Sequence, residues 1–288
     1  MEKSRKIAVL TGATGGIGSV VCRHLADLGY FVYASCRNSR KATALLDSIP
    51  KEKREYIEFV NLDLTSLKSA EDFCNTIISS LNGAKIDLLI NNAGMIAHKL
   101  GITPDGYETS MQVNYISVKS ITEKLISHIS GKIINTVSCT IHSASLNRAL
   151  KNAQGGFSAT ERERKQSTIS SLCRYSDSKL MLAFYTLDLA KRCKGSSISV
   201  YGADPGIVDT GIITMHRWYD PIANIVFRPF IKSAEQGAQP IINAIAHKSM
   251  EGQDDGASLL FAGNRYKSFP QRIRKRYDRS LKYISPLP

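Results

Sequence analysis

A tyrosine and a lysine lie four residues apart in the run Tyr175-Ser176-Asp177-Ser178-Lys179. On a helix, residues at i and i+4 share one face, so the two side chains would lie side by side. A free tyrosine has a pKa of about 10 and is a poor base at neutral pH. A neighbouring ammonium group stabilises the phenolate, which would let Tyr175 exchange a proton with a substrate oxygen. The alternative is a tyrosine packed in the core and a lysine on the surface.

A glycine-rich turn near the start of the chain predicts a partner for this pair. It follows the apolar run Ile7–Leu10 and precedes an amphipathic stretch. Glycines permit a tight turn and a close approach of phosphate to the backbone, and the following helix offers free N–H groups and a partial positive charge. The turn therefore predicts a dinucleotide site. Its expected contacts are Gly12, Thr14, Gly15, Gly16, Ile17 and Gly18.

The end of the second expected strand favours one cofactor. An Asp or Glu there would bind the ribose 2′-hydroxyl of NAD, but the run Ser35–Arg40 contains no acid. Arg37 can instead pair with a 2′-phosphate through its planar fork, with Asn38 beside it. These residues predict that NADP(H) is preferred and NAD(H) is the weaker cofactor. A solvated surface arginine is the alternative.

The order of these and further motifs resembles the short-chain dehydrogenase/reductase family from about Lys6 to Gln239, closest to its retinol-dehydrogenase-like branch. The matching pieces are the T-G-x-x-x-G-x-G turn, Asp63-Leu64, Asn91-Asn92-Ala93-Gly94, Asn114 in Gln-Val-Asn, Ser138, Tyr175-x-x-x-Lys179, and Pro205-Gly206 with Thr210.

The resemblance implies a role for each matching residue. Tyr175 would exchange the proton, Ser138 would position the substrate oxygen, and Asn114 would hold a water linking Lys179 to solvent. Asp63 would meet the adenine, while Asn91 and Gly94 would flank the cofactor. The remaining cofactor contacts implied are Leu64, Ala93, Tyr175, Lys179, Pro205, Gly206, Val208 and Thr210. The implied reaction interconverts a carbonyl and an alcohol. The aromatic and apolar side chains of Gly211–Phe230 predict that the substrate is small and hydrophobic.

The elements expected to position these residues alternate along the chain. Strands that alternate with helices indicate a parallel sheet covered on both faces. We expect a single-domain α/β fold over residues 1–288, a Rossmann-type doubly wound sheet of about seven strands. The expected strands are Lys6–Thr11, Phe31–Ser35, Tyr56–Asn61, Ile86–Asn91, Lys132–Ser138, Ser197–Asp204 and one near Ser258–Phe261. The expected helices are Ile17–Leu28, Arg40–Ile49, Leu67–Leu81, Tyr107–Ser130 and Leu172–Lys191.

Two segments depart from this alternation. Thr140–Ser171 is polar and long, and such loops are usually functional or disordered. Gly211–Ser233 contains Trp218, Phe227 and Phe230 but no strand or long-helix pattern. We expect residues 140–171 to form an inserted loop and 211–233 a lid, both near the substrate pocket.

Composition restricts the remaining classes. The chain has 288 residues, of which 43% are hydrophobic and 22% charged, and no run of 18 apolar residues appears. No transmembrane segment or signal peptide is expected, which predicts a cytoplasmic protein. The six cysteines form no CxxC pair and no zinc spacing, so we expect free thiols and no metal site. A homodimer and a homotetramer are both compatible with the sequence.

Net charge is +13 and is concentrated near the end of the chain, where Arg265–Lys282 holds eight basic residues and one acidic residue. Such a cluster can bind nucleic acid or an anionic membrane, or be a solvated tail or a fringe that attracts an anionic cofactor. No recognition motif accompanies it, so no specific nucleic-acid binding is expected. We interpret residues 264–288 as a basic C-terminal tail.

Two further functions compete with the oxidoreductase. One is a regulatory protein that binds the cofactor without significant turnover; such proteins typically lose the Tyr or the Lys, and both are present here. The other is an interaction protein that uses its basic tail. A dehydratase or epimerase of the family's extended branch is less favoured because its motifs differ.

Overall fold

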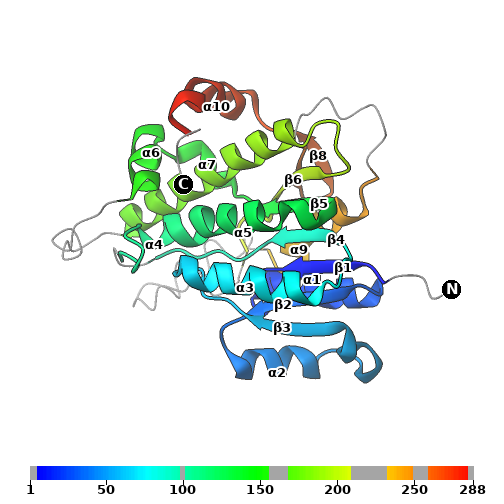
Figure 1. Ribbon diagram of the computed structural model, residues 1–288. Helices are drawn as coiled ribbons and strands as arrows, with labels where there is room; N and C mark the ends of the chain where they lie inside the picture. Colours follow the sequence, from blue (N-terminus) through cyan, green and yellow to red (C-terminus); the bar gives the residue numbers. More distant parts are fainter. Residues whose placement is uncertain (1–4, 98–100, 156–167, 209–231, 249–258, 285–288) are drawn as a thin grey trace.

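The computed structural model describes residues 5–97, 101–155, 168–208, 232–248 and 259–284. Within them, one eight-stranded sheet has the order β3-β2-β1-β4-β5-β6-β7-β8 (Figure 1). Strands β3 to β7 of this order are parallel, and β8 pairs antiparallel with β7. The doubly wound Rossmann-type sheet is confirmed, with one strand beyond the seven expected. The strands are β1 (Ile7–Leu10), β2 (Phe31–Cys36), β3 (Ile57–Asn61), β4 (Ile86–Asn91), β5 (Ile129–Thr136), β6 (Ser199–Asp204), β7 (Leu259–Ala262) and β8 (Arg265–Ser268).

The strand order reverses between β1 and β4, and this reversal sets the place of the site. The chain runs outward from β1 to β3 and then returns to β4 on the other side of β1. In sheets of this type, ligands bind in the crevice beyond the carboxyl ends of the strands at that point. The backbone N–H of Thr11 donates to Ile90 O at 3.0 Å, so the segments that follow β1 and β4 lie side by side.

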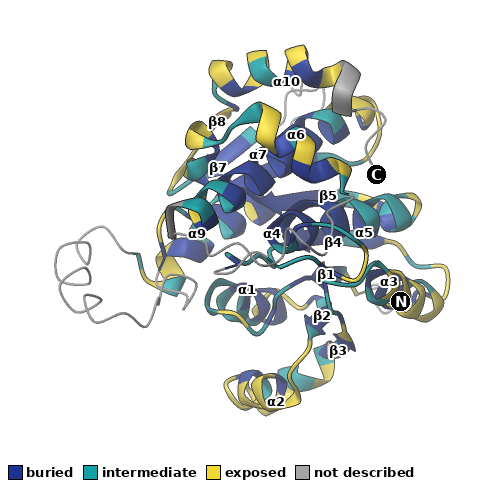
Figure 2. Cartoon of the chain, turned by 90° about the vertical axis from the view of Figure 1, so that its left-hand side faces the viewer, coloured by how far each residue is buried: buried dark blue, intermediate teal, exposed yellow. Residues whose placement is uncertain are grey.

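Helices cover both faces of the sheet. One core joins the sheet to α3, α5 and α7, and a second joins it to α1, α2 and α9. Figure 2 shows the buried strands between these layers. The helices are α1 (Gly16–Asp27), α2 (Ser39–Asp47), α3 (Leu67–Ser80), α4 (Thr109–Met111), a π-helical turn (Gln112–Ile116), α5 (Ser117–Leu125), α6 (Leu146–Gln154), α7 (Thr168–Arg192), α9 (Ala234–Ala246) and α10 (Gln271–Ile284). Short 3₁₀ helices are Lys51–Tyr56, Ile126–His128 and Cys139–Ser143.

Local sequence explains where several helices begin. The side chains of Asn38 and Ser66 accept hydrogen bonds from backbone N–H groups in the first turns of α2 and α3. Ser233 and Gln236 form a reciprocal capping box at the start of α9, a helix that the sequence analysis did not predict. Capping side chains satisfy backbone donors that have no partner within the helix.

The segment expected as an inserted loop is partly helical. It contains the 3₁₀ helix after β5, then α6, and its end already belongs to α7. The α6 helix begins at the capping side chain of Ser145, and Ala149 and Ala153 are buried. The polar composition of the segment concealed this helix, because few of its residues are apolar and face inward. Residues 156–167 and 209–231 lie outside the described residues, so the expected lid with Trp218, Phe227 and Phe230 stays a prediction.

The basic tail expected at residues 264–288 needs correction. Residues 265–284 form β8 and α10, and α10 packs on α7 and α6 (Figure 1). One face of α10 is buried, and its residues Ile273, Tyr277 and Ser280 have the spacing of a single helix face. The charged residues hid this inward face in the sequence. Among the described helices, none combines the length and the apolar character that crossing a membrane requires.

Candidate active site

The glycine turn after β1 forms an open cradle at the start of α1. Gly12 has a φ of +69°, and a Cβ there would lie 2.8 Å from Ala93 Cα. A Cβ on Gly18 would lie 2.0 Å from Gly12 O, so neither position has room for a side chain. Because no side chain projects from these two positions, the backbone N–H groups at the start of α1 stay accessible to a phosphate. This cradle fits the dinucleotide that the sequence predicts.

A cavity of about 410 Å³ extends from the turn along the ends of β2, β3 and β4. Twelve of the predicted cofactor contacts line it: Gly12, Thr14, Gly15, Gly16, Ile17, Gly18, Arg37, Asn38, Asp63, Leu64, Ala93 and Gly94. Its other lining residues are Ser35, Cys36, Lys41, Leu62, Asn92, Met95 and Val113. Lys41 was not among the predicted contacts, because its place at this edge depends on how α2 leaves β2.

The structure distinguishes two neighbouring asparagines that the sequence analysis treated as one motif. Asn91 is buried inside the sheet, and its amide donates to Thr122 Oγ1 at 3.0 Å and to Asn135 Oδ1 at 2.9 Å. Asn92 is the one that lines the cavity, and its amide donates to Thr11 O at 3.1 Å. Successive side chains of a strand point to opposite faces, and that alternation was the available signal. Asn91 therefore supports the strands rather than facing the cavity.

Charged side chains gather at the end of the cavity formed by β2 and β3. Arg37 Nη1 lies 3.4 Å from Asp63 Oδ1, and the two side chains are 65% and 42% exposed. Burial raises the pKa of Asp63, but hydrogen bonds from Thr65 and the charge of Arg37 outweigh burial and hold that pKa below its ordinary value. Lys41 lines the same end of the cavity. This end is positively charged and open to solvent.

Lys179 lies on α7 and approaches the end of the cavity formed by Gly94. A Cβ added to Gly94 would lie 3.2 Å from both Lys179 Nζ and Asn114 Oδ1. Lys179 Nζ donates to Thr136 O at 2.7 Å and lies 5.9 Å from the centroid of the Tyr175 ring. The Ser138 side chain lies near enough to the Tyr175 hydroxyl to lower the pKa of that tyrosine. The four predicted catalytic residues thus lie together beside a cavity-lining glycine.

Asn114 belongs to the π-helical turn between α4 and α5, and its side chain is fully buried. Its Oδ1 accepts from Met95 N at 2.9 Å, and its Nδ2 donates to Met95 O and Ser178 Oγ, each at 2.9 Å. These bonds fasten the segment after β4 to the helix that carries Tyr175. The water-holding role implied by the resemblance stays a prediction.

Burial shifts both members of the Tyr–Lys pair away from their charged forms. It raises the pKa of Tyr175 to about 12, although the hydrogen bond from Ser138 acts in the opposite direction. Burial also lowers the pKa of Lys179 to about 8, partly offset by the charge of Asp204. The expectation that Lys179 would lower the tyrosine pKa is therefore wrong for the protein chain by itself. Removing the phenolate from water raises the pKa by more than the Ser138 side chain lowers it.

The turn after β6 lies outside the cavity lining. Gly206 has a φ of +75°, and its N–H donates to Asp204 Oδ1 at 2.9 Å. Lys232 Nζ donates to Pro205 O at 3.1 Å, and Val208 is buried. Thr210 lies outside the described residues, and the cofactor roles of Pro205, Gly206 and Val208 stay predictions. Within the described part of the chain, no three His, Cys, Asp or Glu residues are grouped as metal ligands.

This fold and site define a Rossmann-type oxidoreductase with a nicotinamide cofactor. Residues 6–150 match the short chain dehydrogenase family, and the chain belongs to the short-chain dehydrogenase/reductase family, a family of oxidoreductases that act on CH–OH groups. The chain is 30% identical to retinol dehydrogenase 12 of Mus musculus over 251 residues, which cover 85% of this chain and 75% of that protein.

Two further proteins extend the comparison. The chain is 29% identical over 273 residues to the WW domain-containing oxidoreductase of Drosophila melanogaster, covering 94% of this chain but only 64% of that relative's length. An NADPH-bound carbonyl reductase from chicken fatty liver shares the fold, with a TM-score of 0.65 and 20% identity over 92% of this chain and 99% of that one.

Proposed function

We propose that this protein is an NADP(H)-dependent oxidoreductase that interconverts a carbonyl and an alcohol on a small, hydrophobic substrate, with Tyr175 as proton donor and acceptor. One observation carries the proposal. Lys179 Nζ and Asn114 Oδ1 both approach Gly94, which lines the dinucleotide-sized cavity, and Tyr175 lies on the same helix face as Lys179. The proton-transferring group and the hydride-supplying cofactor would therefore meet at one place.

The preference for NADP(H) rests on charge at the β2 end of the cavity. Arg37 and Lys41 supply two positive charges there, and β2 ends without an acid that could bind a ribose 2′-hydroxyl. A 2′-phosphate would pair with the guanidinium in a bidentate manner and with the ammonium as a point charge. Asp63 already accepts from Thr65 N and Oγ1, at 3.0 Å and 2.8 Å, which leaves Arg37 only a long contact to give up.

The bound nicotinamide would supply or accept hydride; the residues of this chain handle the oxygen and its proton. Tyr175, with a pKa of about 12, is protonated at neutral pH and ready to donate to a carbonyl oxygen. Ser138 would hydrogen-bond the same oxygen and hold it beside the tyrosine. Lys179, beside Gly94, would bind the ribose and assist the returning proton.

The substrate is proposed to be hydrophobic because of Trp218, Phe227 and Phe230 in the segment after the β6 turn. Retinol, named in one similar protein, is an apolar alcohol, which agrees with this class. A cytoplasmic location and a homodimeric or homotetrameric state complete the proposal.

The test is a screen of the purified chain against aldehydes, ketones, steroids and quinones, with NADPH or NADH as the reductant. We expect NADPH consumption with a subset of hydrophobic carbonyls and formation of the corresponding alcohol. The Tyr175→Phe variant serves as the matched control. Tight NADPH binding with no consumption across the screen would instead favour the cofactor-binding regulatory protein.

A further inference from the structure

The helix that carries Tyr175 also holds a buried acidic side chain that the proposed chemistry does not use. Asp177 lies two residues after Tyr175 and its side chain is 0% exposed. Aspartate is rarely buried unless it is paired, because removing a charge from water is costly. Burial raises the pKa of Asp177, and its hydrogen-bond partners oppose that rise. Its partners therefore decide what it does.

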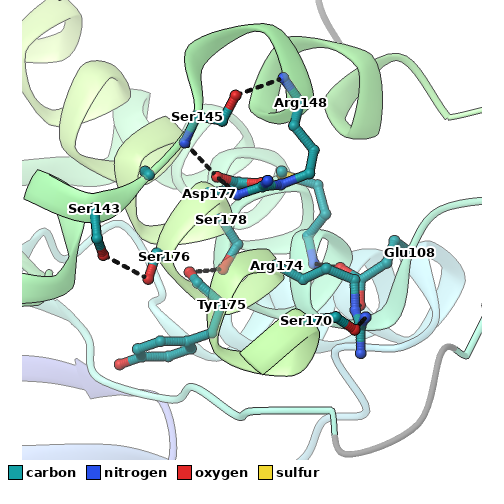
Figure 3. A network of polar contacts seen from close by, with 12 residues as sticks. Glu108, Ser143, Ser145, Arg148, Ser170, Arg174, Tyr175, Ser176, Asp177 and Ser178 are labelled. Carbon is teal, nitrogen blue, oxygen red and sulfur yellow. Dashed lines mark hydrogen bonds and ion pairs between the residues drawn. The ribbon is translucent and has the colours of Figure 1, made fainter. Parts of the chain in front are cut away.

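Those partners all belong to the segment that follows Ser138. Asp177 Oδ1 accepts from Ser145 N at 2.9 Å and from Arg148 Nη2 at 3.0 Å. Arg148 Nε donates to Asp177 Oδ2, which completes a bidentate pair (Figure 3). A bidentate arginine–carboxylate pair fixes orientation as well as distance. The start of α6 is thus held against the Tyr175 helix at one point.

Two further residues, Ser176 and Arg276, contact the same segment. Ser143 and Ser176 join their hydroxyls at 3.4 Å, so a second residue of the Tyr175 motif touches it (Figure 3). From the other side, Arg276 of α10 donates to Ala144 O at 2.8 Å and to Ile141 O at 3.5 Å. The segment between β5 and α6 therefore lies between two helices, and its main charged contact is Asp177.

The other end of this segment controls Ser138. Ser138 Oγ accepts from Thr140 N at 3.3 Å and from Thr140 Oγ1 at 3.1 Å, and the Ser138 side chain lies near enough to the Tyr175 hydroxyl to lower its pKa. Residues 139–148 thus form a short strap whose beginning orients the Ser138 hydroxyl and whose end is fixed by Asp177. Both attachment points, Tyr175 and Asp177, lie on α7.

We propose that Asp177 is a positioning residue, which holds the Ser138 hydroxyl against the Tyr175 hydroxyl through the strap of residues 139–148. The proposal rests on the proposed function for its effect on turnover. The contact between Ser138 and Tyr175 can also be measured without turnover. The strap gives the motif Tyr175-Ser176-Asp177-Ser178-Lys179 a third functional member besides its tyrosine and lysine.

Asp177→Asn is the principal variant, because it keeps the size of the side chain and removes the charge. We expect kcat on a carbonyl found in the screen to fall at least about tenfold, while NADPH affinity stays within about twofold. Arg148→Lys is the milder variant, since Arg148 is 41% exposed and the lysine keeps the charge without the fork. It should show a smaller loss of the same kind. Adding Asp177→Asn to Arg148→Lys should cost no more than Asp177→Asn alone, because both act through one contact.

Glu123→Gln is the matched control. It breaks another arginine–carboxylate pair of α7, with Arg192, at the far end of the helix from Tyr175. We expect its kcat to stay within about twofold of the parent protein. The proposal would be overturned if kcat of both Asp177→Asn and Arg148→Lys stayed as close to the parent value as kcat of Glu123→Gln.

A second readout separates this proposal from the proposed function. Tyrosines labelled with carbon-13 at the ring carbon bearing oxygen give an NMR signal for Tyr175, assigned by its loss in Tyr175→Phe. We expect that signal to move in Asp177→Asn in the same direction as in Ser138→Ala and to stay in place in Glu123→Gln. This result would support positioning even if no carbonyl were reduced. An unmoved Tyr175 signal in a folded Asp177→Asn protein would refute positioning even if the parent enzyme were active.

Discussion

The two ends of the site are built in opposite ways. At the glycine turn and β2, binding depends on backbone N–H groups and on charged side chains in solvent, such as Arg37, which is 65% exposed. Around Tyr175, the polar side chains are buried: Asn114 and Asp177 are 0% exposed and Lys179 is 2% exposed. Exposed charges are screened and adjust easily, whereas buried ones need fixed partners. The cofactor end is suited to affinity and the tyrosine end to geometry.

This contrast predicts which property of the protein changes when a residue at each end is replaced. A change at the cofactor end should alter binding and leave the chemistry of bound complexes intact. A change to Tyr175 or to the residues that position it should alter rate or stability with little effect on cofactor affinity, whereas a change to Lys179, which would bind the ribose, should alter both. Variants of Tyr175, Arg37 and Lys179, together with those of Asp177, test this separation.

Tyr175→Phe should lower turnover by about 10²–10⁴-fold, because it deletes only the proton that a general acid donates. NADPH affinity should stay within about twofold. Steady-state kinetics and fluorescence titration of the same preparations measure both quantities. Near-normal turnover would show that another group donates the proton.

Arg37→Ala should weaken NADPH binding about tenfold to hundredfold, because a hydrogen bond to a charged group contributes about 1.5–3 kcal/mol. NADH affinity should change little. Arg40→Ala is the control, since Arg40 is exposed on the same helix end and does not line the cavity. Equal affinity of the unmutated protein for the two cofactors would contradict the role assigned to Arg37.

Lys179 should make the stability of the cofactor-free protein rise with pH. Burial lowers its pKa from 10.5 to about 8, so between these values the unfolded chain binds more protons than the folded one. Below pH 8 the cost of the buried charge is fully present, and it is relieved as pH rises. The gain should reach up to about 2 kcal/mol near pH 9.5 at 1.36 kcal/mol per pKa unit.

Urea unfolding of the parent protein and of Lys179→Met across this range isolates the effect. The difference between the two proteins cancels other groups that titrate there, including Lys132, whose pKa burial also lowers to about 8. The free energy of unfolding of the parent should rise with pH relative to that of Lys179→Met. Parallel curves would show that Lys179 keeps its ordinary pKa in the folded chain.

Local patterns predicted the parts of the fold and site that neighbouring residues determine. The glycine turn, the first six strands and the shared face of Tyr175 and Lys179 follow from periodicity and turn chemistry. Asn91 was predicted as a cofactor contact, but Asn92 lines the cavity. A shift of one residue along a strand reverses which face a side chain occupies, so the motif alone did not distinguish the two. Lys41 escaped because its place depends on how α2 leaves β2.

Other features depend on contacts between distant segments. The basic run after Arg265 folds as β8 and α10 because Ile273 and Tyr277 find a surface on α7, which no local pattern reveals. Likewise, Asp177 reads as a solvated helix residue until Ser145 and Arg148 are brought to it. The raised pKa of Tyr175 reflects burial by the whole fold, whereas the sequence indicated only the nearby lysine.

In the proposed reaction, the two ends of the site act together in hydride transfer to a carbonyl. The most direct measurement follows deuterium from NADPH labelled at the reactive ring position into the alcohol formed from a hydrophobic carbonyl. We expect an alcohol heavier by one deuterium with the parent protein, and almost none with Tyr175→Phe despite unchanged NADPH binding. A parent protein that binds NADPH tightly yet transfers no deuterium to any carbonyl would contradict it.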